Sequence, residues 1–289
     1  MKKKVGIPGK LLVFLTFLFL YAPIIFLIVF SFNDSKSRTV WAGFTLDWYV
    51  KLFSNQMVLN SLYVTLILSA LAAVISTIAG TFAAIGFFGM NRKIRTPLLA
   101  INNIPVINAD IITGVSMSLL FISAGGLLRW LGETLWSVAG IYLPSLIDAK
   151  IELGFGTLLI AHVSFNIPYV ILSVMPKLYQ LDKNLFEAAQ DLGCTWMQAF
   201  YKVIIPEISP GIVNGMIIAF TMSIDDFVIS YFTAGSKVQT LSMTIFAMTR
   251  RRVSPEINAI STLLFAAVFI LLLFNNIREA RQEKVWSGK

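Results

Sequence analysis

The sequence predicts an all-α membrane protein, a polytopic bundle of about six transmembrane helices that occupies residues 1–289 as a single domain. Of the 289 residues, 57% are hydrophobic and only 13% are charged, and the mean hydropathy is +0.78. Soluble globular domains carry about 25% charged residues, so the composition excludes a fold in water. Apolar stretches long enough to cross ~30 Å of hydrocarbon recur along the whole chain, which indicates one membrane domain.

The basic balance of the chain does not indicate a nucleic-acid partner. The formal net charge is +8, but the Lys and Arg residues lie in short segments between apolar stretches and form no basic stripe interleaved with aromatic residues. The lipid bilayer is therefore the expected environment. The single cysteine, Cys194, excludes a disulfide or a CxxC metal site within the chain.

Six apolar stretches of about 20 residues or more are the predicted spans. They are residues 11–32, 58–88, 97–124, 154–176, 208–231 and 258–277. The basic start and the first apolar stretch resemble a secretory signal. That stretch is too long and no small-residue cleavage site follows it, so we expect it to remain as the first span.

An even number of spans places both termini on the same side, and the basic residues indicate which side. The segments 1–10, 89–96, 177–207 and 278–289 carry 14 of the 23 Lys and Arg residues. The positive-inside rule therefore predicts that both termini, including the tail at 278–289, are cytoplasmic. The cluster of Arg250, Arg251 and Arg252 lies on the opposite side in this arrangement and does not fit the rule.

The second span carries small residues at four-residue spacing, which let helix backbones approach closely in lipid. These residues are Ala72, Ser76, Gly80 and Ala84. We expect this stripe to pack inside the bundle.

The third span is interrupted near its middle by polar residues and a proline. The interrupting residues are Asn102, Asn103, Pro105, Asn108 and Asp110. Because lipid does not tolerate an exposed polar backbone, this stretch is expected to face protein or a water-filled path.

The segment 182–206, in the longest predicted cytoplasmic stretch, is expected to form an amphipathic helical element outside the bilayer. Its apolar residues recur at three- and four-residue spacing. They are Leu185, Ala189, Leu192, Trp196, Ala199 and Val203. Asn184 and Glu187 have the spacing of a capping pair, and Gly193 permits a sharp bend between two short helices.

The same segment resembles the EAA motif of binding-protein-dependent importer permeases. The matching residues are Glu187, Ala188, Ala189, Gly193, Val203, Ile205 and Pro206. The family prefers Ile at the position of Val203 and Leu at that of Ile205, and both differences keep an apolar side chain. The resemblance implies the type I fold of ATP-binding-cassette (ABC) importer permeases, in which this short coupling helix docks into a groove of a separate ATPase subunit.

For the individual residues, the resemblance implies that Glu187, Ala188, Ala189 and Gly193 contact the ATPase. A simpler interpretation is that Glu187 only caps its own helix. The two roles are compatible.

The resemblance extends over nearly the whole chain to the PotC-type permeases of spermidine/putrescine importers. It rests on the segments 44–49, 182–206, 223–226 and 253–259. It implies a polyamine importer of the inner membrane whose partners are a second, PotB-like permease, two copies of a PotA-like ATPase and a PotD-like extracytoplasmic polyamine-binding protein. The segment 125–153 is longer than the external loop usual in that family.

Three carboxylates lie within the predicted spans, where ionisable groups are costly and indicate function. Asp110 lies about halfway along its span, and Asp225 and Asp226 lie deep in the fifth, pointing ~100° apart on one helix. Spaced carboxylates suit an extended polyamine cation, so we predict that all three line the substrate pathway. The alternatives are that Asp110 caps a half-helix and that one of the other two caps a helix or pairs with a basic group.

Aromatic residues follow the first span, and among them Trp48 is predicted to contact the cation through its ring face. The alternative for such external tryptophans is anchoring at the membrane interface. His162, the only histidine, has no second ligand with which to hold a metal, so it is expected to be a buried structural residue.

The chain is not expected to be an enzyme. Gly9 and Lys10 lack the glycine spacing and the Ser or Thr of a phosphate loop, so ATP and Mg²⁺ are expected in the partner ATPase and no cofactor in this chain. Two other functions remain open: an ABC permease for a different organic cation or a metal complex, and an ion-coupled carrier that works alone.

Overall fold

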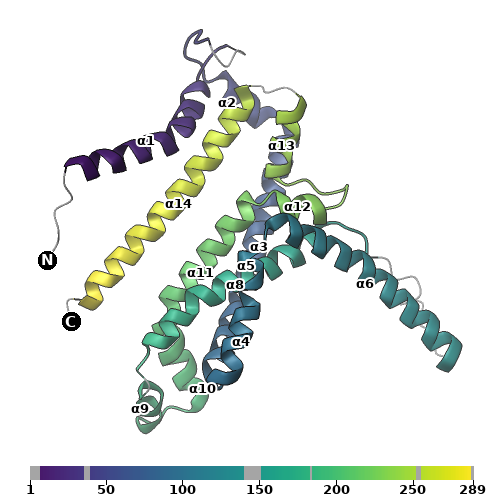
Figure 1. Ribbon diagram of the computed structural model, residues 1–289, viewed down its shortest axis with the longest axis vertical. Helices are drawn as coiled ribbons and strands as arrows, with labels where there is room; N and C mark the ends of the chain where they lie inside the picture. Colours follow the sequence, from purple (N-terminus) through teal and green to yellow (C-terminus); the bar gives the residue numbers. More distant parts are fainter. Residues whose placement is uncertain (1–6, 36–39, 140–150, 183, 252–254, 288–289) are drawn as a thin grey trace. The chain divides into compact units, whose positions relative to one another are not determined.

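Helices form nearly all of the regular structure in the computed structural model, which describes residues 7–35, 40–139, 151–182, 184–251 and 255–287. In chain order (Figure 1) they are α1 (Ile7–Phe30), α2 (Asp47–Ser54), α3 (Gln56–Gly89), α4 (Arg92–Asn102), α5 (Ile104–Ile107), α6 (Asp110–Ala139), α8 (Phe155–Gln180), α9 (Leu185–Asp191), α10 (Trp196–Ala199), the π-helix η1 (Phe200–Ile204), α11 (Ile205–Asp225), α12 (Val228–Thr233), α13 (Leu241–Arg251) and α14 (Pro255–Ser287). One isolated antiparallel bridge joins Asn33 and Phe44.

Six of the described helical stretches are long and apolar enough to cross a membrane, which confirms the predicted bundle of six spans. They are Pro8–Phe30, Gln56–Gly89, Asp110–Leu135, Phe155–Gln180, Trp196–Asp225 and Pro255–Ile277.

The third span lies further along the chain than the predicted 97–124. Asn103 ends α4, Pro105 opens the one-turn helix α5, and Asn108 is extended, so a membrane-length helix starts only at Asp110. The helix then continues through most of the residues expected to form an external loop at 125–153, as far as Ala139. Residues 140–150 of that expected loop lie outside the described residues.

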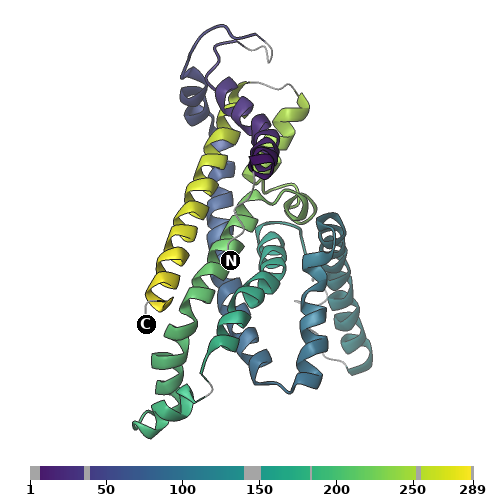
Figure 2. The same ribbon diagram turned by 60° about the vertical axis from the view of Figure 1, so that its left-hand side comes forward.

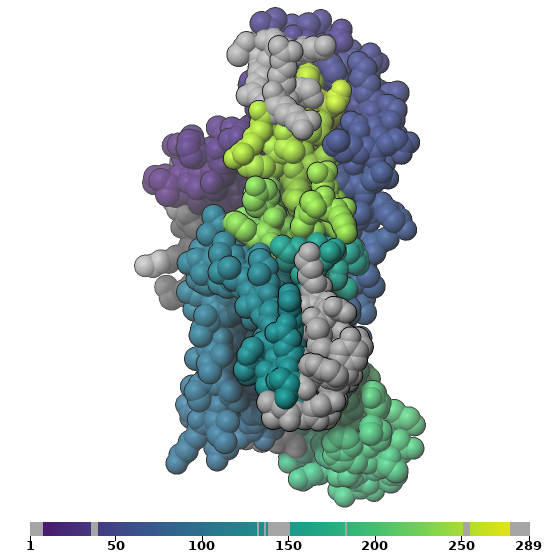
Figure 3. All heavy atoms as spheres, turned by 90° about the vertical axis from the view of Figure 1, so that its right-hand side faces the viewer, coloured from purple at the N-terminus to yellow at the C-terminus, as the bar shows by residue number. Residues whose placement is uncertain are grey.

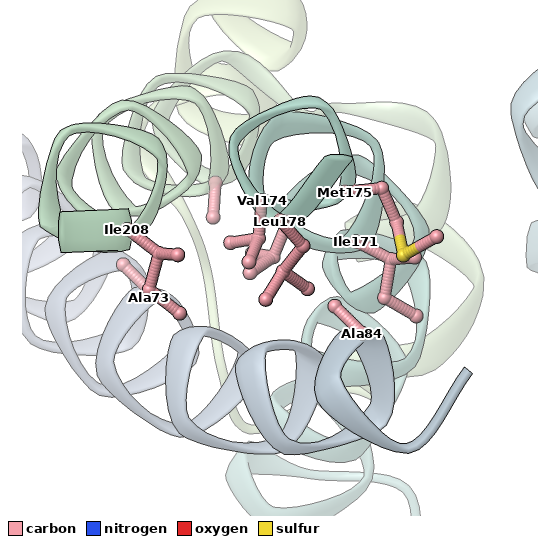
Figure 4. Close-up of a cluster of buried hydrophobic side chains, with 9 residues drawn as sticks. Ala73, Ala84, Ile171, Val174, Met175, Leu178 and Ile208 are labelled. Atoms are coloured by element: carbon pink, nitrogen blue, oxygen red, sulfur yellow. The ribbon is translucent and has the colours of Figure 1, made fainter. Parts of the chain in front are cut away.

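The contacts of the chain divide it into two units, residues 1–60 with 244–270 and residues 61–243 with 271–289. In the second unit, α8 and α11 run side by side in both views (Figure 1, Figure 2). Their buried side chains meet those of α3. Figure 4 shows Ala73 and Ala84 of α3, Ile208 of α11, and Ile171, Val174, Met175 and Leu178 of α8 pointing toward one another.

The small-residue stripe on α3 is buried, as predicted. Ala72, Ser76 and Ala84 are each 0% exposed, and a Cβ on Gly80 would lie 2.8 Å from the Cβ of Val170 on α8. Small residues therefore set the close spacing of α3 and α8.

Two glycines of α11 give the same close approach to α8. A Cβ on Gly211 would lie 2.8 Å from the Ser173 carbonyl oxygen, and a Cβ on Gly215 would lie 3.2 Å from the Val170 Cα. These neighbours are backbone atoms, so neither helix can yield by changing a rotamer. Further along α11, the Asn275 Nδ2 of α14 donates to Asn214 Oδ1 at 3.0 Å.

We expect Gly211→Ala to lower the free energy of unfolding by about 1–3 kcal/mol, because the added methyl group forces α8 and α11 apart. Thermal unfolding of the purified complex in detergent measures the effect. Gly86→Ala is the matched control, because nothing lies within 4 Å of its added Cβ and Ala favours a helix over Gly. An equal decrease in the free energy of unfolding in both variants would contradict the role of close packing at Gly211.

Candidate functional site

The predicted cytoplasmic element folds into the two short helices α9 and α10, with Gly193 between them. Gly193 has φ +86°, a left-handed conformation that glycine adopts without strain. Its N–H donates to the Gln190 carbonyl at 2.8 Å, and the Cys194 N–H donates to the Ala189 carbonyl at 3.1 Å. The two bonds make a Schellman motif that ends α9, which confirms the bend predicted at Gly193.

The capping pair predicted at the start of α9 is not formed. The Asn184 side chain makes no capping bond because its backbone is helical, with φ −88° and ψ −8°, whereas capping residues are usually extended. Its own N–H donates to Asp182 Oδ1 at 2.9 Å.

A capping box forms instead at the start of α10. The Gln198 N–H donates to Thr195 Oγ1 at 3.3 Å, and the Thr195 N–H donates to Gln198 Oε1 at 3.1 Å. The Thr-x-x-Gln spacing is the sequence signal for this box.

The two helices lie at one end of the second unit (Figure 3), and they expose both polar and apolar residues. Glu187 and Ala188 are exposed, Leu192 is 88% exposed, and Trp196 and Met197 are also exposed. We call these five residues the α9–α10 surface. Ala189, also predicted to contact the ATPase, is buried within its own chain and is not part of this exposed surface, so its predicted contact stays a prediction.

The coupling segment joins the fifth span without a break. Helix α10, the π-helix η1 and α11 run as one stretch from Trp196 to Asp225. The Trp196 ring stacks on Phe200 of η1 with centroids 5.8 Å apart and meets Phe186 of α9 edge-on. The backbone and these ring contacts therefore both connect α9 and α10 to η1, which continues into α11.

At the C-terminal end of α11, the two adjacent aspartates have different surroundings. Asp225 is the last residue of the helix and is exposed, whereas Asp226 is extended, with ψ 122°, and its side chain is 8% exposed. Asp226 Oδ1 accepts the Ile229 N–H at 3.2 Å and Oδ2 accepts the Ser230 N–H at 2.7 Å. The prediction that both point from one continuous helix is therefore wrong, because α11 ends between them and Asp226 caps the first turn of α12.

Asp110 is the first residue of α6 and is exposed, not halfway along a span as predicted. One turn later, a Cβ on Gly114 would lie 3.0 Å from the Phe232 ring and 3.3 Å from the Val228 carbonyl oxygen of α12. The start of α6 therefore packs along α12. The structure thus brings Asp110 into the same region of the unit as the break at Asp226.

A row of buried polar side chains on α8 packs against the break between α11 and α12, and this row was not predicted. His162, expected to be a buried structural residue, is 1% exposed, and its Nε2 lies 3.0 Å from Ser230 Oγ and 3.5 Å from Asp226 Oδ2. One turn away, Asn166 Nδ2 donates to Ser223 Oγ of α11 at 2.7 Å. The four-residue spacing of His162 and Asn166 was the available sequence signal, because it places both on one helix face.

Trp48 lies in the first unit, and its ring is 5% exposed. The indole Nε1 donates to the Asn33 carbonyl at 2.8 Å, and Lys51 Nζ lies 4.6 Å from the ring centroid. A ring that is buried and already faces a cation is not available to a passing solute. These contacts favour an anchoring role for Trp48, in the segment after α1, over the predicted pathway role, which stays a prediction.

We expect Trp48→Phe to lower the free energy of unfolding by about 1 kcal/mol, through the lost indole hydrogen bond, and to leave uptake per assembled complex unchanged. Thermal unfolding and transport by the same preparation test both parts. Trp41→Phe, at an exposed position, is the control for loss of indole. A raised KM with unchanged stability would restore the pathway role of Trp48.

The described residues include no group of three or more His, Cys, Asp or Glu side chains placed to hold a metal ion. The exposed carboxylates of the site, Asp110 and Asp225, lie at helix ends. Such groups can attract and orient a cation.

Comparison with known proteins identifies the family. A family model described as "Binding-protein-dependent transport system inner membrane component" matches residues 134–282. The putrescine transport system permease protein PotI of Escherichia coli (strain K12) is 36% identical over 280 residues, which cover 96% of this chain and 92% of the relative. The spermidine/putrescine transport system permease protein PotC of the same strain is 29% identical over 259 residues, with 90% and 89% covered.

Solved structures show the same fold. A bacterial alginate ABC transporter, solved with its alginate pentasaccharide-bound periplasmic protein, contains a chain that superposes with a TM-score of 0.71 at 18% identity, covering 94% of this chain and 93% of that one. The MetNI methionine ABC transporter contains a chain with a TM-score of 0.55 at 18% identity, covering 82% and 98%.

The type I importer permease fold predicted from the sequence is thereby confirmed. The predicted resemblance to polyamine permeases is confirmed as well. The family is a transport component without enzymatic activity. With a family match over half of its length and a relative 36% identical across 96% of it, the chain belongs to the binding-protein-dependent transport system inner membrane components and is a multi-pass permease subunit of an ABC transporter.

Proposed function

We propose that this permease subunit moves putrescine or spermidine into the cytoplasm by alternating access driven by a separate ATPase. The observation that carries the proposal is the 36% identity to a putrescine permease over 280 residues. The membrane region also offers carboxylates of the charge that a polyamine needs.

Asp110 and Asp225 are the proposed contacts for the cation. Both are exposed in the isolated chain, at the start of α6 and the end of α11, where a partner permease would complete the path. Their negative charge replaces part of the hydration that an ammonium group loses in the membrane. Asp226 belongs to the same pathway, but its carboxylate is already bonded to α12, so its proposed part is to support Asp225.

The α9–α10 surface is the proposed ATPase contact. Glu187 and Ala188 lie on it, and Gly193 sets the bend that presents it. ATP-driven closure of the ATPase would push this surface and, through the unbroken stretch Trp196–Asp225, move the helix that ends at Asp225.

The proposed assembly contains this chain as one permease domain, a second PotB-like permease, two copies of a PotA-like ATPase and a PotD-like extracytoplasmic binding protein. ATP and Mg²⁺ bind in the ATPase and no cofactor is assigned to this chain. The distribution of 14 of 23 basic residues supports cytoplasmic placement of both termini in the inner membrane.

Reconstitution of the four components in liposomes tests the proposal. We expect accumulation of radiolabelled putrescine that requires both ATP and the binding protein, and competition by spermidine. Competition only by a different organic cation or a metal complex would overturn the cargo. Uptake by the purified chain alone, without an ATPase, would instead support an ion-coupled carrier and overturn the coupling role of α9 and α10.

A further inference from the structure

Helix α8 presents three buried polar side chains to the region where α11 gives way to α12. Thr157 Oγ1 donates to the Thr233 carbonyl at 2.9 Å, His162 Nε2 contacts Ser230 Oγ at 3.0 Å, and Asn166 Nδ2 donates to Ser223 Oγ at 2.7 Å. All three α8 side chains are buried. Asn166 holds the end of α11, and the other two hold α12, so α8 spans the break.

Of the three, His162 alone approaches an ionisable group. Its Nε2 lies 3.5 Å from Asp226 Oδ2. A carboxylate oxygen can only accept a hydrogen bond, so the contact is favourable when Nε2 carries the hydrogen. With Nε2 protonated, its single hydrogen can be donated to the Ser230 hydroxyl, 3.0 Å away, while the N–H group keeps a favourable electrostatic contact with the carboxylate at 3.5 Å.

Asp226 is therefore held from two directions. Backbone N–H groups of Ile229 and Ser230 meet its two oxygens from α12, and the His162 ring meets Oδ2 from α8. A side chain fixed in this way fixes its backbone too, including the extended conformation that ends α11. The residue immediately before it, Asp225, is left exposed at the end of the helix.

We propose that His162 is a positioning residue for the transported cation: it holds Asp226 and Ser230, and thereby sets the break that presents Asp225 to the pathway. The inference rests on the proposed function for the identity of the cation. The positioning of Asp226 by His162 does not depend on which solute is carried.

A purely space-filling histidine would be an unusual choice at this depth. Polar side chains within a membrane span are expensive and mark functional sites by default, and an apolar side chain of similar volume would pack there without the cost of burying an imidazole. The Nε2 atom of His162 is directed at the break between α11 and α12, which is where a fixed geometry matters for transport.

The first test compares His162→Leu and His162→Gln in the reconstituted complex. Leu removes the donor, whereas the Gln side-chain amide can place a donor near the position of Nε2. We expect Leu to lower the Vmax of uptake per assembled complex by about 10-fold or more, the loss expected when the contact with the Asp226 carboxylate and the hydrogen bond with Ser230 are both removed. The KM should stay unchanged because the binding protein captures the solute, and Gln should restore most of the rate.

Thr157→Val is the control, because it removes the buried hydroxyl that joins α8 to α12, together with its bonds to the Gly154 backbone at the start of α8, without touching Asp226. We expect its Vmax per assembled complex to stay near that of the wild type. In a double-mutant cycle, we expect the variant that combines His162→Leu with Asp226→Asn to lose no more Vmax than the single variant with the larger loss. Additive losses, or a Gln variant as slow as the Leu variant, would overturn the proposal.

A second measurement does not depend on transport, so it tests the role of His162 even if putrescine is not the transported solute. His162 is the only histidine of this chain, so its nitrogen-15 NMR signals can be assigned as those missing from the complex with His162→Gln. We expect Asp226→Asn to shift the Nε2 signal and Thr157→Val to leave it unchanged. If Asp226→Asn leaves the chemical shift of Nε2 unchanged, the positioning role is overturned, even if putrescine uptake is observed.

Discussion

Asp225→Asn is expected to lower ATP-driven putrescine uptake by about 10- to 100-fold, as for the loss of a hydrogen bond to a charged partner. Asp225 ends α11 and is exposed, whereas the neighbouring Asp226 is occupied by α12 and His162. The amide keeps the shape of the carboxylate but loses its charge. Initial rates of uptake into liposomes, per assembled complex, measure the effect.

Two further substitutions separate charge from structure at this position. Asp225→Glu keeps the negative charge and should retain most of the activity. Asp47→Asn removes an exposed carboxylate from α2, outside the spans, and should leave uptake unchanged. Wild-type rates for Asp225→Asn and Asp110→Asn alike would remove both proposed contacts from the pathway.

Leu192→Asp should abolish co-purification of the ATPase. Leu192 is 88% exposed on the α9–α10 surface, and docking would bury the new carboxylate without a partner. The cost of such a charge exceeds about 3 kcal/mol, or more than about 100-fold in affinity. Binding of purified ATPase to the immobilised permease complex gives the affinity directly.

Leu192→Met is the matched control, because it keeps an apolar side chain of similar volume. It should bind the ATPase as the wild type does. Thermal unfolding of both variants should match the wild type, since the side chain projects away from its own chain. Normal ATPase binding by Leu192→Asp would place the docking contact elsewhere.

Much of the fold was predictable because hydrophobic length is a strong signal in a membrane protein. The exception is the third span, where the apolar run continues on both sides of the interruption at Asn102 to Asp110. Hydrophobicity alone does not indicate that the membrane-length helix lies on the C-terminal side of this interruption. Gly125 also looked like the start of a loop, whereas in the structure its missing side chain admits Ile151, whose backbone N would lie 3.1 Å from a Cβ there.

The site was predictable only where a residue acts locally. Gly193 could be recognised as a bend, because its role depends on its own backbone and the adjacent turn. The burial of Trp48 against Asn33, fifteen residues away, could not be recognised. Nor could the contact of His162 with Ser230, 68 residues away, since both depend on how separate helices meet.

The glycine contacts that join α11 to α8 have a consequence for how access alternates. Gly211 and Gly215 bring α11 close to backbone atoms of α8, so we expect the two helices to move together as one rigid body. The spacing between Asp225 and the side chains of α8 is then constant throughout the cycle. We therefore expect opening and closing to occur where these two helices meet other helices of the transporter, and not between α8 and α11.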